Sequence, residues 1–334
     1  MIKIAAASLA LFTVTALTAQ EGHHLEWYAD FDVAAAAAKK ANKDLLVDFT
    51  GSDWCGWCIK LHKEVFDHAE FENGVKDHFV LVALDFPRSE EAKAKVPNPQ
   101  RNNELQEQYG IQGFPTILLM SADGEVFGKT GYQPGGPVKY VESLDKMRTE
   151  GKANLAAIKK MVAEYDAAEG PAKTKVLAAA IDKLATMESD QIGIDDIAAI
   201  ALDGLESDDK ALQEKAVVAL LKSGQADEAC RTKAEAMDPN NEKGLLDYTT
   251  RAAMMSVQDD ASAKAFLGKL DTLIEKGAKD AEVFESMLVN AARWSAGPLK
   301  NKEGATKYAK VLKEKAKDAS KHADLFKQIL GEGN

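Results

Sequence analysis

Two cysteines separated by two residues are the feature of this sequence best suited to chemistry. Cys55 and Cys58 enclose Gly56 and Trp57, and the whole chain of 334 residues has three cysteines. Three kinds of site use such a pair: a metal site, a covalent haem attachment, and a dithiol that opens and closes as a disulfide. The neighbouring residues have to distinguish among them.

The neighbours favour the dithiol. Haem attachment requires a histidine directly after the second cysteine, where this chain has Ile59. Zinc could use Cys55, Cys58 and His62, but a structural zinc site needs a fourth ligand and the chain has no second cysteine pair. We interpret His62, like the nearby His68, as a surface or partly packed histidine. The sequence therefore predicts no metal and no cofactor.

The first twenty residues, MIKIAAASLALFTVTALTAQ, have the pattern of a cleavable export signal. One lysine precedes an apolar run over residues 4–17, which is too short to span a bilayer. No other stretch approaches the roughly 18 apolar residues that a membrane helix needs. We expect a signal peptide over residues 1–19 and a mature chain that is periplasmic or secreted, with no stable membrane insertion.

The composition of the chain limits which partners it can bind and which kind of fold it can have. The chain has 42 Lys and Arg residues against 53 Asp and Glu residues, a formal charge of −11, so nucleic acid is not expected to bind. Three cysteines are too few for a fold that depends on disulfides. The length is sufficient for two separate cores.

Helices and strands alternate around the cysteine pair. An Ala-rich helix over 31–42 is followed by an apolar strand over 44–50, and helical character returns after Cys58. Further along we expect a strand over 79–86, a helix over 102–109, a hairpin over 116–130, and a final helix ending near Arg148. This order predicts an α/β layer with a mixed sheet flanked by helices.

The segments LLVDFTGSDWCGWC and YGIQGFPTILLMSADGEVFGKTGY together resemble the thioredoxin-like thiol:disulfide oxidoreductases in motif order and spacing. The resemblance covers about residues 25–150, which sets a thioredoxin-like domain at 20–150. It implies that Cys55 attacks a substrate disulfide and that Cys58 resolves the mixed disulfide. It also implies a cis-proline at Pro115 that faces the dithiol and a buried carboxylate at Asp48.

These implied roles agree with elementary chemistry. A cysteine at a helix N-terminus is more acidic than a free thiol, because unpaired amides and the helix dipole favour the thiolate. The backbone beside Phe114 would be free to pair with an extended substrate segment. Trp54 and Trp57 either pack in the loop or face the substrate, and we include both, with Phe114, among the expected substrate-binding residues.

Two departures from the family pattern bear on function. Gly56 and Trp57 stand where the best-known thioredoxins have Gly-Pro, which leaves open whether the enzyme reduces, oxidises or isomerises disulfides. The lysine that often accompanies the buried aspartate falls at about Ala83, so Asp48 lacks that partner. Asp48 as proton acceptor for Cys58 is accordingly an inference from the resemblance alone.

Beyond residue 150 the strand signals disappear. Ala, Lys, Glu and Leu dominate, and breaks such as Gly170-Pro171 and Gly297-Pro298 divide residues 151–334 into helices of about 12 to 18 residues. We expect an all-α, repeat-like domain of antiparallel helix pairs, in which Cys230 is a small buried hydrophobe. No catalytic group stands out there.

Two functions fit these observations. The first is an exported thioredoxin-like oxidoreductase that exchanges protein disulfides, with protein thiols as substrates and a redox partner protein that recycles the dithiol. The second is a binding or scaffold protein whose helical domain recruits partners and whose cysteine pair is only a structural disulfide. Their reduction potentials would differ.

Overall fold

A computed structural model describes residues 26–331 of the chain. The expected signal peptide over residues 1–19 lies outside the described residues. The chain divides into two compact units, Met1–Glu150 and Gly151–Asn334, and each is described by itself.

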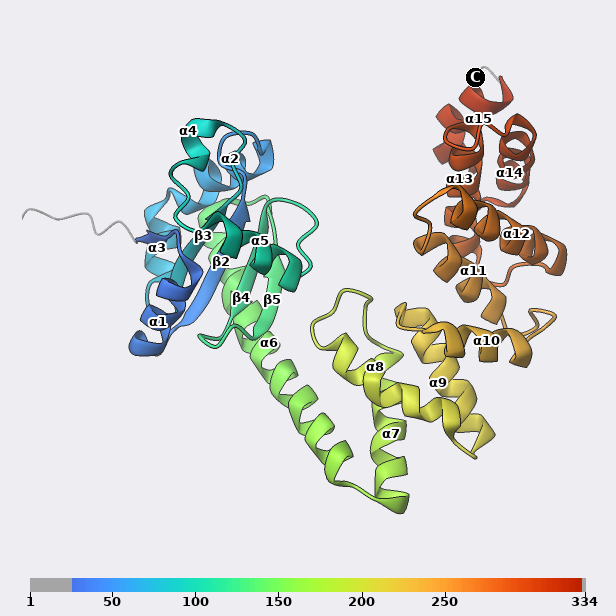
Figure 1. Cartoon of the computed structure of the whole chain (residues 1–334), viewed down its shortest axis with the longest axis horizontal. Coiled ribbons are helices and arrows are strands. Elements are labelled where there is room, and N and C mark those ends of the chain that lie inside the picture. Colours follow the sequence, from blue (N-terminus) through green and yellow to red (C-terminus); the bar gives the residue numbers. More distant parts are fainter. Residues whose placement is uncertain (1–25, 332–334) are drawn as a thin grey trace, which may run out of the picture. The chain divides into compact units, whose positions relative to one another are not determined.

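The first unit is built on a five-stranded mixed sheet (Figure 1). Its strands are β1 (Trp27–Tyr28), β2 (Asp44–Thr50), β3 (Phe79–Asp85), β4 (Thr116–Met120) and β5 (Val126–Thr130). Their spatial order is β1-β3-β2-β4-β5, with β3 parallel to β1 and β2, whereas β4 is antiparallel to β2 and β5. The mixed sheet expected from the sequence is confirmed, and the two-residue β1 is an addition that no sequence pattern indicated.

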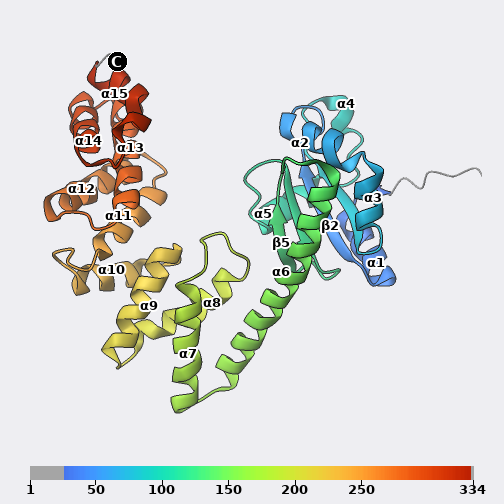
Figure 2. The same cartoon turned by 180° about the vertical axis from the view of Figure 1, so that it is seen from behind.

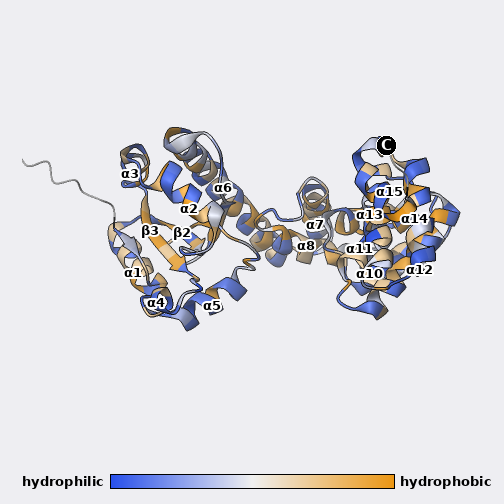
Figure 3. Cartoon of the chain, turned by 90° about the horizontal axis from the view of Figure 1, so that it is seen from above, coloured by the Kyte–Doolittle hydropathy of each residue, from blue (hydrophilic) through white to orange (hydrophobic). Residues whose placement is uncertain are grey.

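Strand β2 is central and buried along its whole length. Its apolar character, shared with β3, is visible in Figure 3. Leu45, Val47 and Phe49 pack in one apolar core with helix α1. Because side chains alternate along a strand, Leu46 and Asp48 lie on the opposite face. This alternation places one carboxylate inside the protein, on the face that does not contact α1.

Helices cover the two faces of this sheet (Figures 1 and 2). They are α1 (Phe31–Ala41), α2 (Gly56–Leu61), a π-helix (His62–Phe66), α3 (Ala69–Val75), α4 (Glu90–Lys93), α5 (Pro99–Gln108) and α6 (Gly136–Ala167). Helix α1 begins where Asp30 accepts hydrogen bonds from two backbone N–H groups, and it ends at Asn42 in the left-handed conformation. The π-helix continues α2 without a break, so a single helical segment follows the cysteine pair.

The expected end of the last helix near Arg148 is wrong, because α6 continues to Ala167. Residues 149–167 are rich in Ala, Lys and Glu, and the one glycine among them, Gly151, costs only about 1 kcal/mol in a helix. The next strong break is Gly170-Pro171, where α7 begins. Within the first unit, Arg148 donates a hydrogen bond from Nε to Asp44 Oδ2 at 2.6 Å. The boundary between the two units therefore falls inside a continuous helix.

The described part of the second unit contains helices and no strand. They are α7 (Gly170–Leu184), α8 (Ile194–Leu202), a 3₁₀ helix (Asp203–Glu206), α9 (Lys210–Ser223), α10 (Glu228–Met237), α11 (Leu245–Met255), α12 (Asp260–Lys276), α13 (Ala281–Ala296), α14 (Lys302–Lys315), a second 3₁₀ helix (Ala319–His322) and α15 (Ala323–Leu330). The all-α prediction is confirmed. Over residues 26–331, none of the helices combines the length and apolar character that a membrane crossing requires.

Buried polar groups of the second unit join its helix junctions. Asp247 on α11 is fully buried and accepts hydrogen bonds from the Asn241 side chain at 2.8 Å and from the backbone N–H groups of Lys279 and Asp280 at 2.8 and 2.5 Å. Such a carboxylate has structural partners for its lone pairs. It fixes the segment before α11 against the segment before α13.

Candidate active site

The two cysteines meet at the start of α2. A disulfide joins Cys55 and Cys58, whose Cα atoms are 5.2 Å apart. Cys55 is the N-cap residue of α2, and its sulfur accepts a hydrogen bond from the backbone N–H of Cys58 at 3.2 Å. Both cysteines are buried, and Cys55, at 6% exposed, is more accessible than Cys58, at 1%.

A tight turn carries the chain from β2 to the disulfide. Ser52 donates to the Asp85 carboxylate from its backbone N–H at 2.8 Å and from its hydroxyl at 2.6 Å. Trp54 donates from its indole nitrogen to the Phe86 carbonyl at 2.8 Å. A side chain at Gly51 would meet the Trp54 ring at 2.6 Å, which explains the glycine. The end of β3 thus fixes the loop that precedes Cys55.

The same loop is fixed by a carboxylate. Asp53 accepts hydrogen bonds from the backbone N–H groups of Arg88 and Ser89, at 2.9 and 2.7 Å. These bonds lower the pKa of Asp53 to about 2. The Arg88 guanidinium lies 3.9 Å from the centre of the Trp54 ring. Trp54 is therefore held on one face by a cation and through its nitrogen by a carbonyl.

The Phe114–Pro115 peptide bond is cis, as the family resemblance implied. Phe114 lies edge-on to Trp54 with ring centroids 5.8 Å apart, and it also contacts Phe86 at 5.2 Å. The structure thus brings the segment before β4 to the loop that carries Cys55, although these residues are about sixty positions apart in sequence.

Trp57, between the cysteines, is 57% exposed. Its ring contacts Tyr132 with centroids 5.1 Å apart, and the Lys60 ammonium lies 5.1 Å from the Trp57 ring and 4.8 Å from the Tyr132 ring. Tyr132 in turn donates its hydroxyl to Glu64 at 2.6 Å. Trp57 therefore presents an exposed aromatic surface beside the disulfide. Trp54 differs from it, because Trp54 is partly buried.

Asp48 lies on β2 with no exposed surface. Opposite it on β3 stands Ala83, so no cationic side chain reaches it from across the sheet. Its Oδ2 is instead 3.1 Å from Nε2 of His62. Oδ1 has no hydrogen-bond partner among residues 26–331. His62 itself keeps 35% of its side chain exposed, and it therefore links a buried carboxylate to solvent.

Burial and the contact between Asp48 and His62 shift the pKa values of these two groups in opposite directions. Burial raises the pKa of Asp48, and the hydrogen bond and positive charge of His62 oppose that rise without cancelling it. Burial disfavours the charged form of His62, but the hydrogen bond and negative charge of Asp48 outweigh it, so the pKa of His62 is raised. Both directions favour the retention of a proton at this pair.

His62 is the residue that the sequence interpretation underestimated. It was expected to be a surface or partly packed histidine, and the structure gives it Asp48 as partner. Two signals in the sequence pointed to it. His62 follows Cys58 by four positions, which places both on one helical face, and Ala83 leaves Asp48 without the usual lysine.

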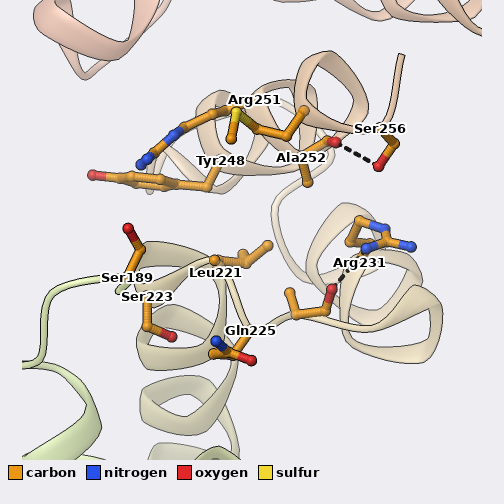
Figure 4. Close-up of a pocket in the computed structure, with 12 residues that line it drawn as sticks. Ser189, Leu221, Ser223, Gln225, Arg231, Tyr248, Arg251, Ala252 and Ser256 are labelled. Carbon is orange, nitrogen blue, oxygen red and sulfur yellow. Dashed lines mark hydrogen bonds between the residues drawn. The ribbon is translucent and has the colours of Figure 1, made fainter. Parts of the chain in front are cut away.

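The second unit offers no comparable chemistry in its described residues. Its free cysteine, Cys230, is buried, and burial raises the pKa of its thiol to about 12. A cavity of about 330 Å³ lies between α9, α10 and α11, with Tyr248, Arg231 and Arg251 among its lining residues (Figure 4). No cysteine or histidine lines it. Within residues 26–331 no cluster of His, Cys, Asp and Glu is suited to hold a metal ion.

Comparison with known proteins adds to this geometry. A family model for a thioredoxin-like domain matches residues 31–146. The disulfide bond reductase DsbH of Chlamydia pneumoniae is 36% identical over 125 residues, which are 36% of this chain and 71% of that protein. The thioredoxin-related protein DsbJ of Chlamydia pneumoniae is 30% identical over 148 residues, 42% of each chain. A solved DsbH oxidoreductase structure is 30% identical, with a TM-score of 0.33, and the match covers 43% of this chain and 94% of that one.

Proposed function

Because this chain belongs to the thioredoxin-like family of thiol:disulfide oxidoreductases, we propose that it reduces disulfide bonds of other proteins through Cys55 and Cys58. The observation that carries this proposal is the disulfide at the start of α2, preceded by a loop that contacts the segment of the cis peptide at Pro115. Reduction is the direction we favour, since a relative of which this chain covers 71% is a disulfide bond reductase.

The proposed reaction has two exchange steps. In the reduced enzyme the Cys55 thiolate attacks a substrate disulfide; a bond forms between Cys55 and one substrate sulfur, and the other substrate sulfur leaves as a thiolate. Cys58 then attacks the Cys55 sulfur, the bond to the substrate breaks, and the Cys55–Cys58 disulfide remains. The substrate gains two electrons, which the enzyme dithiol loses. Asp48 is the proposed acceptor of the Cys58 proton.

The geometry around Cys55 suggests how a substrate is held. Nothing but the backbone of Phe114 and Pro115 is needed to pair with an extended peptide, which makes recognition tolerant of sequence. Trp57 and Tyr132 add an exposed aromatic surface for apolar side chains. Trp54 is bound by Phe86 and Arg88, so we assign it chiefly to fixing the loop.

Export and recycling complete the proposal. The signal-like residues 1–19 support a location outside the cytoplasm, periplasmic or secreted. Each turnover leaves the disulfide oxidised, so a redox partner protein has to reduce it again. We place the chemistry within 20–150 and assign recruitment of partners to residues 151–334, whose described helices carry no accessible thiol.

An assay of both directions tests this function. With dithiothreitol as the recycling reductant, the protein is expected to accelerate reduction of insulin disulfides well above the dithiothreitol background. The oxidised protein is expected to be a poor catalyst of disulfide formation in a reduced, unfolded ribonuclease. Rapid oxidation of ribonuclease without insulin reduction would reverse the proposed direction, and inactivity in both assays would remove the function.

Trp57→Ala tests the proposed substrate surface. Loss of an exposed aromatic contact residue typically costs about 1–2 kcal/mol of binding, so kcat/KM toward insulin should fall about 5- to 30-fold, mainly through KM. Reduction of a small aromatic disulfide should change far less, because it cannot span the surface. Val33→Ala is the matched control. It removes an exposed apolar side chain on a different helix, α1, and should leave both rates unchanged. Equal losses on both substrates would assign Trp57 to the chemistry instead.

A further inference from the structure

His62 is the point where the buried carboxylate of the active site reaches solvent. Its Nε2 lies 3.1 Å from Asp48 Oδ2, while 35% of its side chain remains exposed. On the helical segment, the His62 backbone N–H donates to the Cys58 carbonyl, so the two residues are one turn apart. Side chains four positions apart lie on the same helical face. Cys58 and His62 therefore share one face of the helical segment, and His62 contacts Asp48 on β2.

A π-helix places this histidine. His62 is the first residue of the π-helix His62–Phe66, where the Asp67 backbone N–H donates to the His62 carbonyl at 2.9 Å. π-Helical turns are rare in proteins, and those that occur are often found at functional sites. The imidazole packs against Trp27 and Phe66, with ring centroids 5.7 and 4.9 Å away. These apolar rings fix the orientation of His62 without competing for its nitrogens.

We propose that His62 is a positioning residue for the resolving step, which favours the ionised form of Asp48 and so prepares this carboxylate to accept the proton of the Cys58 thiol. This inference rests on the proposed role of Cys58 as the resolving thiol. Ala83 lies opposite Asp48 on β3, so this strand supplies no cationic partner there. The inference assigns that function to His62.

The proton balance of the step is simple. Cys58 loses its thiol proton to Asp48 Oδ1, the carboxylate oxygen that has no partner among the described residues. The Cys58 sulfur forms a bond with the Cys55 sulfur, and the bond between Cys55 and the substrate breaks to release a substrate thiolate. Asp48 then gives this proton to solvent and returns to the carboxylate form, while the imidazolium of His62 keeps both of its ring protons and its contact with Oδ2. One proton reaches solvent for each substrate thiolate released.

The charges that face the pair come from several elements. Asp67, after the π-helix, and Asp85, at the end of β3, add to the charge of Asp48 and favour the imidazolium. Asp85 also opposes ionisation of Asp48, and the Tyr140 hydroxyl on α6 is a buried neighbour whose pKa is raised by burial and by the Asp48 charge. Among the described residues, His62 alone lowers the pKa of Asp48. Removal of the imidazolium should therefore leave Asp48 protonated up to a higher pH.

A single-turnover experiment with dithiobis(nitrobenzoate) separates the two exchange steps. One equivalent is added to the reduced full-length protein. The first release of thionitrobenzoate reports attack by Cys55, and the second reports resolution by Cys58. In His62→Gln the first phase is expected to match the wild type. The midpoint of the second phase should move to higher pH by about one unit, which at neutral pH is a rate about tenfold lower. The two proteins should converge near pH 9.

Two further variants make the result specific. His62→Lys restores a cation and should return the midpoint towards that of the wild type, which a purely structural histidine would not require. His68→Gln removes another histidine of the same unit, whose ring contacts the Lys63 carbonyl, and should change neither phase. Thermal unfolding of every variant reports folding, and His62→Asn replaces His62→Gln if the latter does not fold.

The outcomes distinguish the inference from the function on which it rests. An unchanged second-phase midpoint in folded His62→Gln would overturn the role of His62 while the first phase still supports Cys55. A midpoint that moves in His62→Gln but is not restored by His62→Lys would overturn the role of the positive charge. Absence of the first phase in the wild type would instead remove the proposed function itself.

Discussion

Cys55→Ser is expected to lower insulin reduction by a factor on the order of 1000 or more, because the variant has no sulfur that can attack the substrate. Cys58 is not expected to take over, since it is buried in α2 and only 1% exposed. Cys230 cannot take over either, because it is buried and burial raises the pKa of its thiol to about 12. The rate is measured by the turbidity of the released insulin chains.

Cys58→Ser should behave differently. Attack by Cys55 remains possible, but the mixed disulfide cannot be resolved internally and accumulates. We expect a covalent adduct with a disulfide-bonded substrate that runs as one species without reductant and separates with it. Cys230→Ser is the matched control and should retain full activity. If Cys58→Ser forms no adduct and Cys55→Ser stays active, the assigned order of attack is wrong.

The sheet of the first unit could be predicted because local and tertiary signals agree there. Continuous apolar runs indicate β2 and β3 as strands. The turn residues between β4 and β5 indicate a hairpin. The two-residue β1 has too short a pattern to be recognised. The end of α6 was misplaced because the boundary between the units carries no helix breaker, and a helix stops for local reasons rather than at a domain edge.

The site was predictable where it is local in sequence and less so where it depends on pairing. Cys55 and Cys58 are adjacent along the chain, and the cis peptide at Pro115 followed from the family resemblance. The contact of His62 with Asp48 requires the register of a helix against a strand fourteen residues away, which no periodicity specifies. Trp54 and Trp57 look equivalent in sequence, yet a hydrogen bond to the Phe86 carbonyl fixes Trp54 in the loop, whereas Trp57 is 57% exposed.

The alternative to a catalytic dithiol is a structural disulfide between Cys55 and Cys58. In that case the helical unit would be the working part and the bond between Cys55 and Cys58 would only stabilise the loop before α2. The two accounts predict different equilibria with thiols, because structural disulfides resist reduction by the glutathione pool and catalytic ones do not.

The reduction potential of the Cys55–Cys58 pair is the most direct measurement. The full-length protein is equilibrated with graded ratios of reduced and oxidised glutathione or dithiothreitol, thiols are alkylated, and the reduced fraction is read by mass. A redox-active dithiol should titrate at a potential above about −300 mV. A pair that remains disulfide-bonded below about −300 mV would contradict the account and identify the bond as structural.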